Sequence, residues 1–488
     1  MEFLHTQKKK VLTESGKEMF LRGISIGGWM NLENFINGFP GTEISLREHV
    51  VSTLGRERGK LFFDSMLSEF FNADDIRFIK STGASCIRAA LNYRHFEDDE
   101  QPFVYKEEGF ARLKEMVERC SENGLYVIFD MHAVQGWQNT HWHSDNDRGI
   151  SLFWTDACFQ NRYYALMQEI ARRFKDEPAV AGYELLNEPS SSCRSGDYPF
   201  NMYENFTSDY RRFNKIMRTA VEKIREIDRK HIIFIEGDSY GHNFAGLEEP
   251  FDSNLVYASH DYITSGFGPG RYPGSYEILH NDRVEAACYW DYNRQITHIT
   301  ETEGWKFSEK YQVPLWVSEF GSQYCTGEED NLYRLASMDD QLKAMNELKL
   351  HWTPWTYKDC GTMGLVTVNP ESEYMTKVAP VQKMKGLLGA ENFTAWRSEC
   401  PGKEVTRQFT DYMMSLLTKA PEYTFGTFQK CMNYALLTGF AAGVLQPEYA
   451  ALFENDSPED IRRIMKSFSL ENCIVNEPYL KILQKRLL

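Results

Sequence analysis

The chain has 488 residues, 42% of them hydrophobic, and a formal net charge of −16 from 54 basic and 70 acidic residues. This length allows one large barrel with an appendage, or two to three smaller domains. Because acidic residues are in excess and no block of Lys and Arg dominates, the basic patch of a nucleic-acid-binding protein is missing, and we expect no nucleic-acid partner.

The segment MEFLHTQKKKVLTESG at the N-terminus contains no apolar stretch of signal-peptide length, and no run of about 18 apolar residues occurs anywhere. The ten cysteines are scattered without a Cys-x-x-Cys pair, which favours reduced thiols over disulfides or a zinc ribbon. We therefore expect a cytoplasmic protein without a membrane segment.

Strand-like and helix-like segments alternate along most of the chain after an N-terminal hairpin that turns near Ser15-Gly16. The predicted strands cover residues 21–29, 86–91, 125–132, 180–189, 231–237, 255–262, 314–321 and 352–359. The predicted helices cover residues 73–82, 110–120, 158–174 and 206–227, a stretch within 284–310, and residues 331–348.

Eight such alternations predict an α/β fold, a (β/α)8 TIM barrel, in which functional sites lie at the C-terminal ends of the strands. A doubly wound open sheet is the competing fold, but it normally carries a Gly-rich phosphate-binding turn after its first strand. The segment GISIGGW at residues 23–29 lacks the GxGxxG spacing. We therefore expect the barrel.

From about residue 401 onward the sequence predicts helices without strands. Apolar residues recur at helical spacing within residues 405–417, and Ser457-Pro458 is a strong helix start. We expect two domains: residues 1–400 form the barrel with its N-terminal hairpin, and residues 401–488 form a C-terminal helical extension. These helices could pack against the barrel or join two copies of the chain into a homo-oligomer.

Two of the predicted strands lead into a glutamate. The segment VAGYELLNEP, residues 180–189, contains Asn187 and Glu188, and PLWVSEFG, residues 314–321, contains Glu319. Glycoside cleavage needs one carboxyl group that protonates the leaving oxygen and a second that attacks the sugar or activates water. Glutamates at the tips of barrel strands four and seven can face each other across the mouth, although a single strand-end glutamate is more often a salt-bridge partner.

The segments LLNEP and WVSEFG resemble the acid/base and nucleophile strands of glycoside hydrolase family 5, a family of retaining (β/α)8 glycosidases. Further positions agree in the same order along the chain. These are Arg88 in CIRAAL, His132 in FDMHAVQG, Asn187 in LLNEP, His260 and Tyr262 in SHDY, and Trp355 in WTPWTYKD. The resemblance covers the barrel and not the C-terminal helices.

The resemblance implies roles for these residues. Glu188 would be the general acid and then the general base, kept protonated by a weakly polar setting or by neighbouring negative charge. Glu319 would be the ionised nucleophile, held charged and aimed by Arg88 and Tyr262. Asn187 would donate to the sugar 2-hydroxyl, a contact that strengthens in the transition state.

His132 and His260 would bind hydroxyls or orient the carboxylates, and Trp355 would offer an apolar face to the sugar in the −1 subsite. Each position has a structural alternative: Arg88 could form a buried ion pair, Trp355 could fill the core, and both histidines could be structural. Glu236, which ends the fifth predicted strand in FIEGDSYG, is a third acidic strand tip that could contact substrate or serve the structure.

The loop GWQNTHWHSDND, residues 136–147, mixes residue types that suit sugars and metals. The candidates for the pocket wall are Trp137, Gln138, Asn139 and Trp142, and the metal-binding types are His141, His143, Asp145 and Asp147. A solvated loop is the alternative. Because family 5 chemistry uses no metal, we expect neither a metal nor a cofactor.

The segments GISIGGWMNLENFI and GWQN resemble exo-acting branches of the family, near exo-β-1,3-glucanases, glucosylceramide-type hydrolases and cytosolic β-mannosidases. We therefore expect a retaining exo-β-glycosidase that removes a terminal β-linked hexose, mannose or glucose, from oligosaccharides or glycoconjugates. The segment TYKDCGTMGL favours the β-mannosidase branch. A non-catalytic sugar-binding barrel is a remote alternative, since such a protein would usually have lost one glutamate. A metal-dependent barrel hydrolase is another alternative, and loss of activity in a metal chelator would favour it over the glycosidase.

Overall fold

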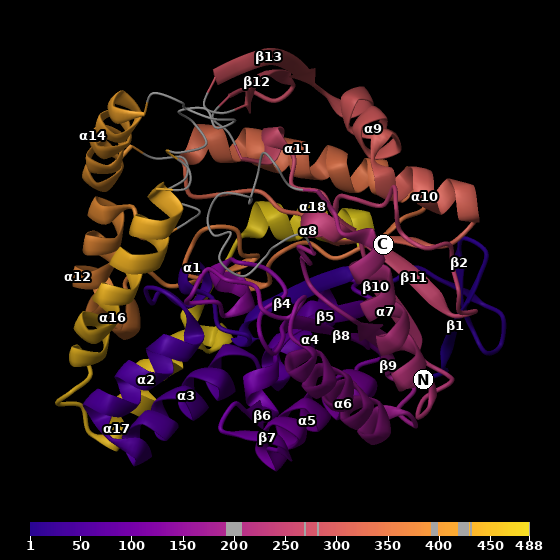
Figure 1. Ribbon diagram of the computed structural model, residues 1–488, viewed down its shortest axis with the longest axis horizontal. Helices are drawn as coiled ribbons and strands as arrows, with labels where there is room; N and C mark the ends of the chain where they lie inside the picture. Colours follow the sequence, from indigo (N-terminus) through magenta and orange to yellow (C-terminus); the bar gives the residue numbers. More distant parts are fainter. Residues whose placement is uncertain are drawn as a thin grey trace.

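The computed structural model describes residues 1–191, 207–267, 270–280, 283–391, 399–417, 429 and 432–487. Its centre is an eight-stranded parallel sheet surrounded by helices (Figure 1). In chain order the strands are β4 (Gly23–Met30), β5 (Cys86–Asn92), β8 (Tyr126–Ala133), β9 (Val180–Glu184), β10 (Ile232–Glu236), β11 (Leu255–His260), β14 (Leu315–Glu319) and β15 (His351–Trp352). Strands that follow one another in this order are neighbours in the sheet, as eight successive βα units predict.

The first and last strands close the sheet into a barrel. The Trp352 N–H donates to the Leu21 carbonyl at 3.0 Å, and the Ser25 N–H donates to the Pro354 carbonyl at 3.1 Å. Every residue of the strands β5 and β8 is buried, because side chains fill the barrel on one face and helices cover the other. The predicted α/β barrel is confirmed.

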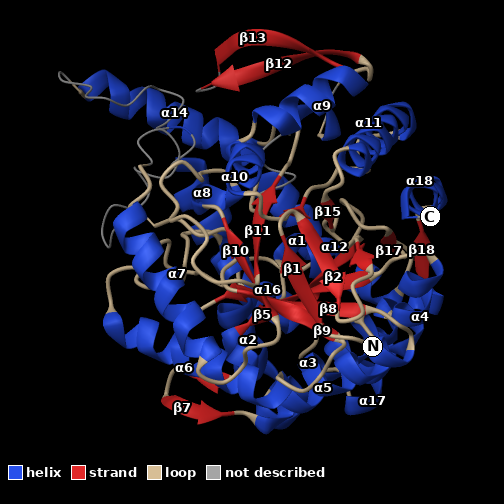
Figure 2. Ribbon diagram, turned by 90° about the vertical axis from the view of Figure 1, so that its right-hand side faces the viewer, coloured by secondary structure: helices blue, strands red, loops and turns tan. Residues whose placement is uncertain are grey.

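Helices form the outer layer around the red strands in Figure 2. The helices beside the barrel strands are α4 (Ala73–Ser81), α5 (Glu107–Glu122), α6 (Ala157–Phe174), α7 (Tyr210–Arg225), α8 (Asp238–Gly241), α9 (Tyr292–Glu301), α10 (Glu303–Tyr311) and α11 (Glu328–Glu347). In α5 the apolar residues from Phe110 to Cys120 recur at helical spacing, and this stripe is buried against the barrel.

The N-terminal segment covers one end of the barrel. It forms the strands β1 (Leu4–Gln7), β2 (Lys10–Thr13) and β3 (Glu18–Met19), with the predicted turn at Ser15-Gly16 between the last two. Leu4 and Val11 join a buried cluster with Phe234 and Trp316 from inside the barrel. Since this end receives the N-terminal ends of the strands, the open mouth lies at their carboxyl ends.

Several regions before the C-terminal helices differ from the sequence prediction. The last predicted strand, residues 352–359, is shorter, since β15 ends at Trp352 and Lys358–Asp359 belongs to another sheet. The chain between β4 and α4 forms three unpredicted helices, which are α1 (Asn34–Asn37), α2 (Glu43–Leu54) and α3 (Arg56–Phe70). The helix predicted within residues 284–310 begins later, because β13 (Arg283–Trp290) pairs antiparallel with β12 (Gly274–His280). Residues such as alanine favour a helix locally, but pairing across the hairpin overrides that preference.

The C-terminal helices pack on the outer helices of the barrel. They are α12 (Glu373–Leu388), α14 (Pro401–Leu416), the π-helix η4 (Asn433–Ala441), α16 (Ala442–Ala451), α17 (Pro458–Met465) and α18 (Glu477–Leu487). Helix α16 contacts α2, α17 contacts α3, and α18 contacts α11. The expected absence of strands is wrong, since β18 (Cys473–Val475) pairs with β17 (Val366–Val368). The domain division at residue 400 and the self-association stay predictions.

The remaining elements are short. They are β6 (Glu97–Asp98), β7 (Gln101–Tyr105), β16 (Lys358–Asp359), η1 (Tyr93–His95), η2 (Trp142–Ser144), η3 (Thr264–Gly266), η5 (Lys466–Phe468) and η6 (Leu470–Asn472). No helix in the described ranges is both long enough and apolar enough to cross a membrane.

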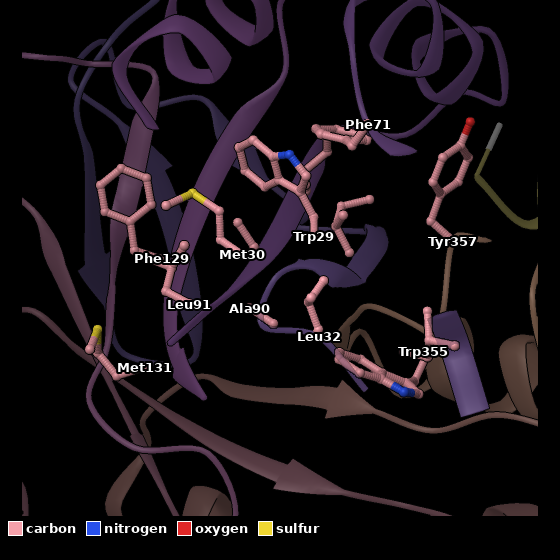
Figure 3. Close-up of a cluster of buried hydrophobic side chains, with 14 of the residues drawn as sticks. Trp29, Met30, Leu32, Phe71, Ala90, Leu91, Phe129, Met131, Trp355 and Tyr357 are labelled. Atoms are coloured by element: carbon pink, nitrogen blue, oxygen red, sulfur yellow. The ribbon is translucent and has the colours of Figure 1, made fainter. Parts of the chain in front are cut away.

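The main hydrophobic core lies between the barrel and its helices and reaches the mouth. Figure 3 shows Trp29 and Phe71 in this core, and their rings meet edge to face with centroids 5.3 Å apart. Trp355, in the segment after β15, belongs to the same cluster. The core therefore supports the ends of the strands that carry polar side chains.

Candidate active site

Three strands bring two glutamates and a histidine together at the mouth. Glu188 follows β9, His260 is the last residue of β11, and Glu319 is the last residue of β14. One ligand-type atom from each side chain lies within 4.8 Å of the others. Parallel barrel strands end at the same rim, so the two carboxylates lie close together there, as the sequence predicts.

The Glu319 carboxylate is held through both oxygens. Arg88 Nη1 donates to Oε1 at 2.5 Å, and the Tyr262 hydroxyl donates to Oε2 at 2.9 Å. A charged donor and a phenol on separate oxygens fix the plane of a carboxylate. The structure therefore brings together the three residues that sequence reasoning grouped around the nucleophile.

Arg88 is the centre of a buried ionic network. Its Nε donates to Glu184 Oε2 at 2.6 Å, its Nη2 donates to Asn187 Oδ1 at 2.8 Å, and the same Nη2 lies 3.1 Å from Asp130 Oδ2. Arg88 is 0% exposed. Burial raises the pKa of Glu184 to about 7, although Arg88 opposes this shift. Arg88 thus combines the two roles that the sequence left open, since it orients Glu319 and also forms a buried ion pair.

Glu188 lies between two imidazoles. His260 Nδ1 is 2.8 Å from Oε1, and His143 Nε2 is 3.0 Å from Oε2. Burial alone would raise the pKa of Glu188, but His143 and His260 together hold this pKa well below its usual value. The ligand-free protein therefore differs from the expectation of a protonated Glu188, because a histidine from a distant loop reaches the carboxyl group.

Glu236 lies behind Glu188. Its two oxygens each accept a hydrogen bond from the Glu188 backbone N–H at 3.1 Å, and its Oε2 is 3.4 Å from His260 Nε2. The Glu236 side chain is 0% exposed, so this geometry favours the structural alternative over direct substrate contact. Burial would lower the pKa of His260, but Glu236, Glu319 and Glu188 raise it to about 9.

His132 and Trp355 form one stacked unit beside the carboxylates. Their rings are 5.1 Å apart at an interplanar angle of 6°. His132 Nδ1 lies 2.7 Å from Asp130 Oδ2, and its Nε2 lies 3.3 Å from Asn187 Nδ2. Trp355 is only 3% exposed and one of its faces carries His132, so its role as a sugar platform stays a prediction.

The loop of residues 136–147 is largely buried and not solvated. Gln138 Nε2 donates to the Asn187 carbonyl at 2.9 Å, and Asn139 Nδ2 donates to the Glu188 carbonyl at 2.9 Å. The Trp137 indole N–H donates to the Asp145 carbonyl at 2.8 Å, and Trp137 is half-buried. Gln138 and Asn139 thus hold the strand end that carries Glu188, while a pocket-wall role for Trp137 stays a prediction.

The side chains in this loop that could bind a metal do not gather at one point. His143 contacts Glu188, whereas Asp145 accepts hydrogen bonds from Asn92 at 3.0 Å and Arg94 at 3.1 Å. In the part of the chain that the structure describes, the compact group of His and carboxylate side chains is the one at the mouth. Its Glu319 oxygens already bind Arg88 and Tyr262, so this group fits a carboxylate pair better than a metal site.

Glu33 is a further carboxyl group at the mouth that sequence reasoning did not single out. It follows β4 and is buried, and its Oε1 lies 3.4 Å from His132 Nε2. Within the described residues no hydrogen bond reaches this oxygen. Burial raises the pKa of Glu33, although His132 opposes the shift. The sequence did contain a signal for this residue, because Glu33 is the only acidic residue in the apolar segment GISIGGWMNLENFI.

We expect the Glu33→Gln variant to lose about 10- to 100-fold in kcat/KM, because a hydrogen bond from a sugar hydroxyl to a charged group contributes about 1.5–3 kcal/mol. Its melting temperature should stay the same or rise, since an amide removes a buried acidic group. Steady-state kinetics and thermal melting of both proteins check this. An unchanged kcat/KM would show that Glu33 does not contact the substrate.

Comparisons with known proteins agree with this geometry. The family model "Cellulase (glycosyl hydrolase family 5)" matches residues 57–361. A "Beta-xylosidase" of Phanerodontia chrysosporium is 32% identical over 498 residues, which cover 99% of this chain and 98% of that protein. A "Glucan 1,3-beta-glucosidase" of Lachancea kluyveri is 23% identical and covers 73% of this chain and 86% of its own length. A solved structure entitled "Crystal structure of endogalactoceramidase" is 17% identical, has a TM-score of 0.51 and covers 74% of this chain and 75% of its own.

Proposed function

Because the chain belongs to glycoside hydrolase family 5, we propose that it is a retaining exo-β-glycosidase. The observation that carries this proposal is the spacing of Glu188 and Glu319, each of which has a carboxylate oxygen within 4.8 Å of the other. Retaining glycosidases hold their two carboxyl groups about 5–5.5 Å apart, and inverting ones leave about 6.5–9.5 Å for a water molecule. The short spacing supports a double displacement.

In the first step Glu319 attacks the anomeric carbon while Glu188 protonates the leaving oxygen. In the second step Glu188 removes a proton from water, which attacks the glycosyl-enzyme and frees Glu319. The lowered pKa of Glu188 favours its carboxylate form, which suits the second step. For the first step the carboxyl group must gain a proton, and a bound sugar favours this by excluding water from the site.

The names of two relatives, a β-xylosidase and a glucan 1,3-β-glucosidase, support action on a terminal β-linked sugar. The sequence alone predicted a hexose, and the relative at 32% identity adds xylose to the candidates. We propose a terminal β-xylose or β-glucose as the sugar, with β-mannose as the alternative.

Nitrophenyl β-xyloside, β-glucoside and β-mannoside test this proposal. We expect rapid nitrophenol release from one of them and, by NMR, a first-formed sugar in the β-configuration. A sugar that appears first in the α-configuration would contradict retention. A rapid fall in the viscosity of a soluble β-glucan or xylan would indicate endo-cleavage in place of exo-action.

A further inference from the structure

The general acid is contacted by a loop that a C-terminal helix holds. In the loop of residues 136–147, His143 Nε2 lies 3.0 Å from Glu188 Oε2, on the side opposite to His260. The buried His143 ring packs edge to face on Trp142, with centroids 5.3 Å apart. The position of the Glu188 carboxyl group therefore depends on the position of this loop.

Tyr434 of the π-helix η4 lies against the same loop. Its hydroxyl donates to the Thr140 carbonyl at 3.2 Å, and its ring centroid is 4.8 Å from that of His141. The His141 ring also contacts the Tyr240 ring, with centroids 4.9 Å apart, and it stacks on the Trp142 ring, with centroids 5.7 Å apart. Tyr434 is buried although it lies 294 residues beyond Thr140 in the chain.

The loop is also tied directly to the strand end that carries the acid. Asn139 Nδ2 donates to the Glu188 carbonyl at 2.9 Å, and the Ser190 N–H donates to the Gln138 carbonyl at 3.0 Å. These two hydrogen bonds tie the loop to the backbone on either side of Glu188, while His143 reaches the end of its side chain. Movement of the loop at His141 would move His143 relative to the carboxyl group.

We propose that Tyr434 and His143 are positioning residues for the general acid. The C-terminal segment fixes the loop through Tyr434, and the loop fixes the Glu188 carboxyl group through His143. This inference rests on the proposed glycosidase function. It assigns to the C-terminal helices a part in the acid/base step, beyond packing on the barrel.

Several ionisable groups surround the contact between His143 and Glu188. Those that face Glu188 are His141, His242 and His260 with Glu236, Tyr262 and Glu319. Those that face His143 are Glu33, His132 and His141. Of these groups and His143, His141 and His143 come from the loop that Tyr434 holds, and His143 is the one that lies 3.0 Å from Glu188 Oε2.

The consequence depends on the leaving group. As the bond from the anomeric carbon to the leaving oxygen breaks, its electron pair stays on that oxygen, which receives the Glu188 proton, while a Glu319 oxygen bonds to the carbon. An alkoxide needs this proton, whereas dinitrophenolate is stable enough to leave without it. A misplaced general acid therefore slows the cleavage of alkyl glycosides and leaves the cleavage of dinitrophenyl glycosides nearly unchanged.

The test compares His143→Asn, Tyr434→Ala and Tyr434→Phe with the wild type on alkyl and dinitrophenyl glycosides of the sugar that the protein accepts. For His143→Asn and Tyr434→Ala we expect kcat/KM to fall about 100-fold on the alkyl glycoside and less than about 3-fold on the dinitrophenyl glycoside. Tyr434→Phe keeps the ring on His141 and should lose less than Tyr434→Ala. Phe440→Ala is the matched control, because Phe440 lies on the same helix and is 71% exposed.

The pH profile provides a second readout. The contact with His143 lowers the pKa of Glu188, so its loss in His143→Asn should raise that pKa and move the alkaline limb of kcat/KM to higher pH. Equal losses on both substrates, or no loss on the alkyl glycoside, would overturn the proposal. If Tyr434→Ala does not fold, as judged by thermal melting, the activities of Tyr434→Phe and His143→Asn on the alkyl and dinitrophenyl glycosides still test the proposal. A wild type inactive on every glycoside would instead reject the proposed function.

Discussion

The Glu319→Ala variant should lose on the order of 10⁵-fold in kcat, since removal of the proposed covalent nucleophile would eliminate the first chemical step and leave only binding and the proposed acid. Its fold should persist, because alanine removes one charge from the Arg88 network while Glu184 and Asp130 still pair with the guanidinium. Nitrophenol release and circular dichroism of the same preparation measure the two properties separately.

Azide provides a sharper test of the role of Glu319. In Glu319→Ala, azide can enter the space of the missing carboxylate and attack the same face of the sugar, which forms an α-glycosyl azide with an activated nitrophenyl substrate. Glu118→Ala is the matched control, because Glu118 is an exposed glutamate paired with Lys114 on α5. Full activity of Glu319→Ala, or a β-glycosyl azide as its product, would remove Glu319 from the nucleophile role.

The Arg88→Met variant should be the most destabilised single variant, by about 3–5 kcal/mol in the free energy of unfolding, because it leaves buried carboxylates without their cation. Arg88 pairs with Glu184, Asp130 and Glu319, all of them buried. The same change should reduce kcat/KM by at least about 1000-fold, since Glu319, the proposed nucleophile, loses its charged partner. Denaturation in urea and steady-state kinetics check both effects.

A second substitution separates stability from catalysis. Arg88→Met combined with Glu184→Gln removes one uncompensated buried acid, so it should regain part of the stability without regaining activity. Arg148→Met is the control for loss of an arginine, because the Arg148 side chain is 71% exposed. If Arg88→Met unfolds within about 0.5 kcal/mol of the wild type, the network does not hold the mouth together.

The sequence by itself determined the barrel and its main chemical groups. Buried parallel strands are continuous apolar runs, so the strands in VAGYELLNEP and PLWVSEFG could be recognised locally, and the polar residues at the end of each run must lie at the rim. Glu188 and Glu319 were found in this way. Arg88 and Tyr262 were found through resemblance, and the structure places both on Glu319.

The tertiary structure alone decided the contacts between segments that are far apart in the chain. The apolar pattern of a strand does not show which loop lies over its end, so the lowered pKa of Glu188 could not be foreseen before His143 was placed beside it. The pairing of β18 with β17 and the contact of Tyr434 with His141 have the same origin. Local sequence specifies which groups stand at each strand end, and long-range packing sets their charge and orientation, because both depend on neighbours that only folding brings close.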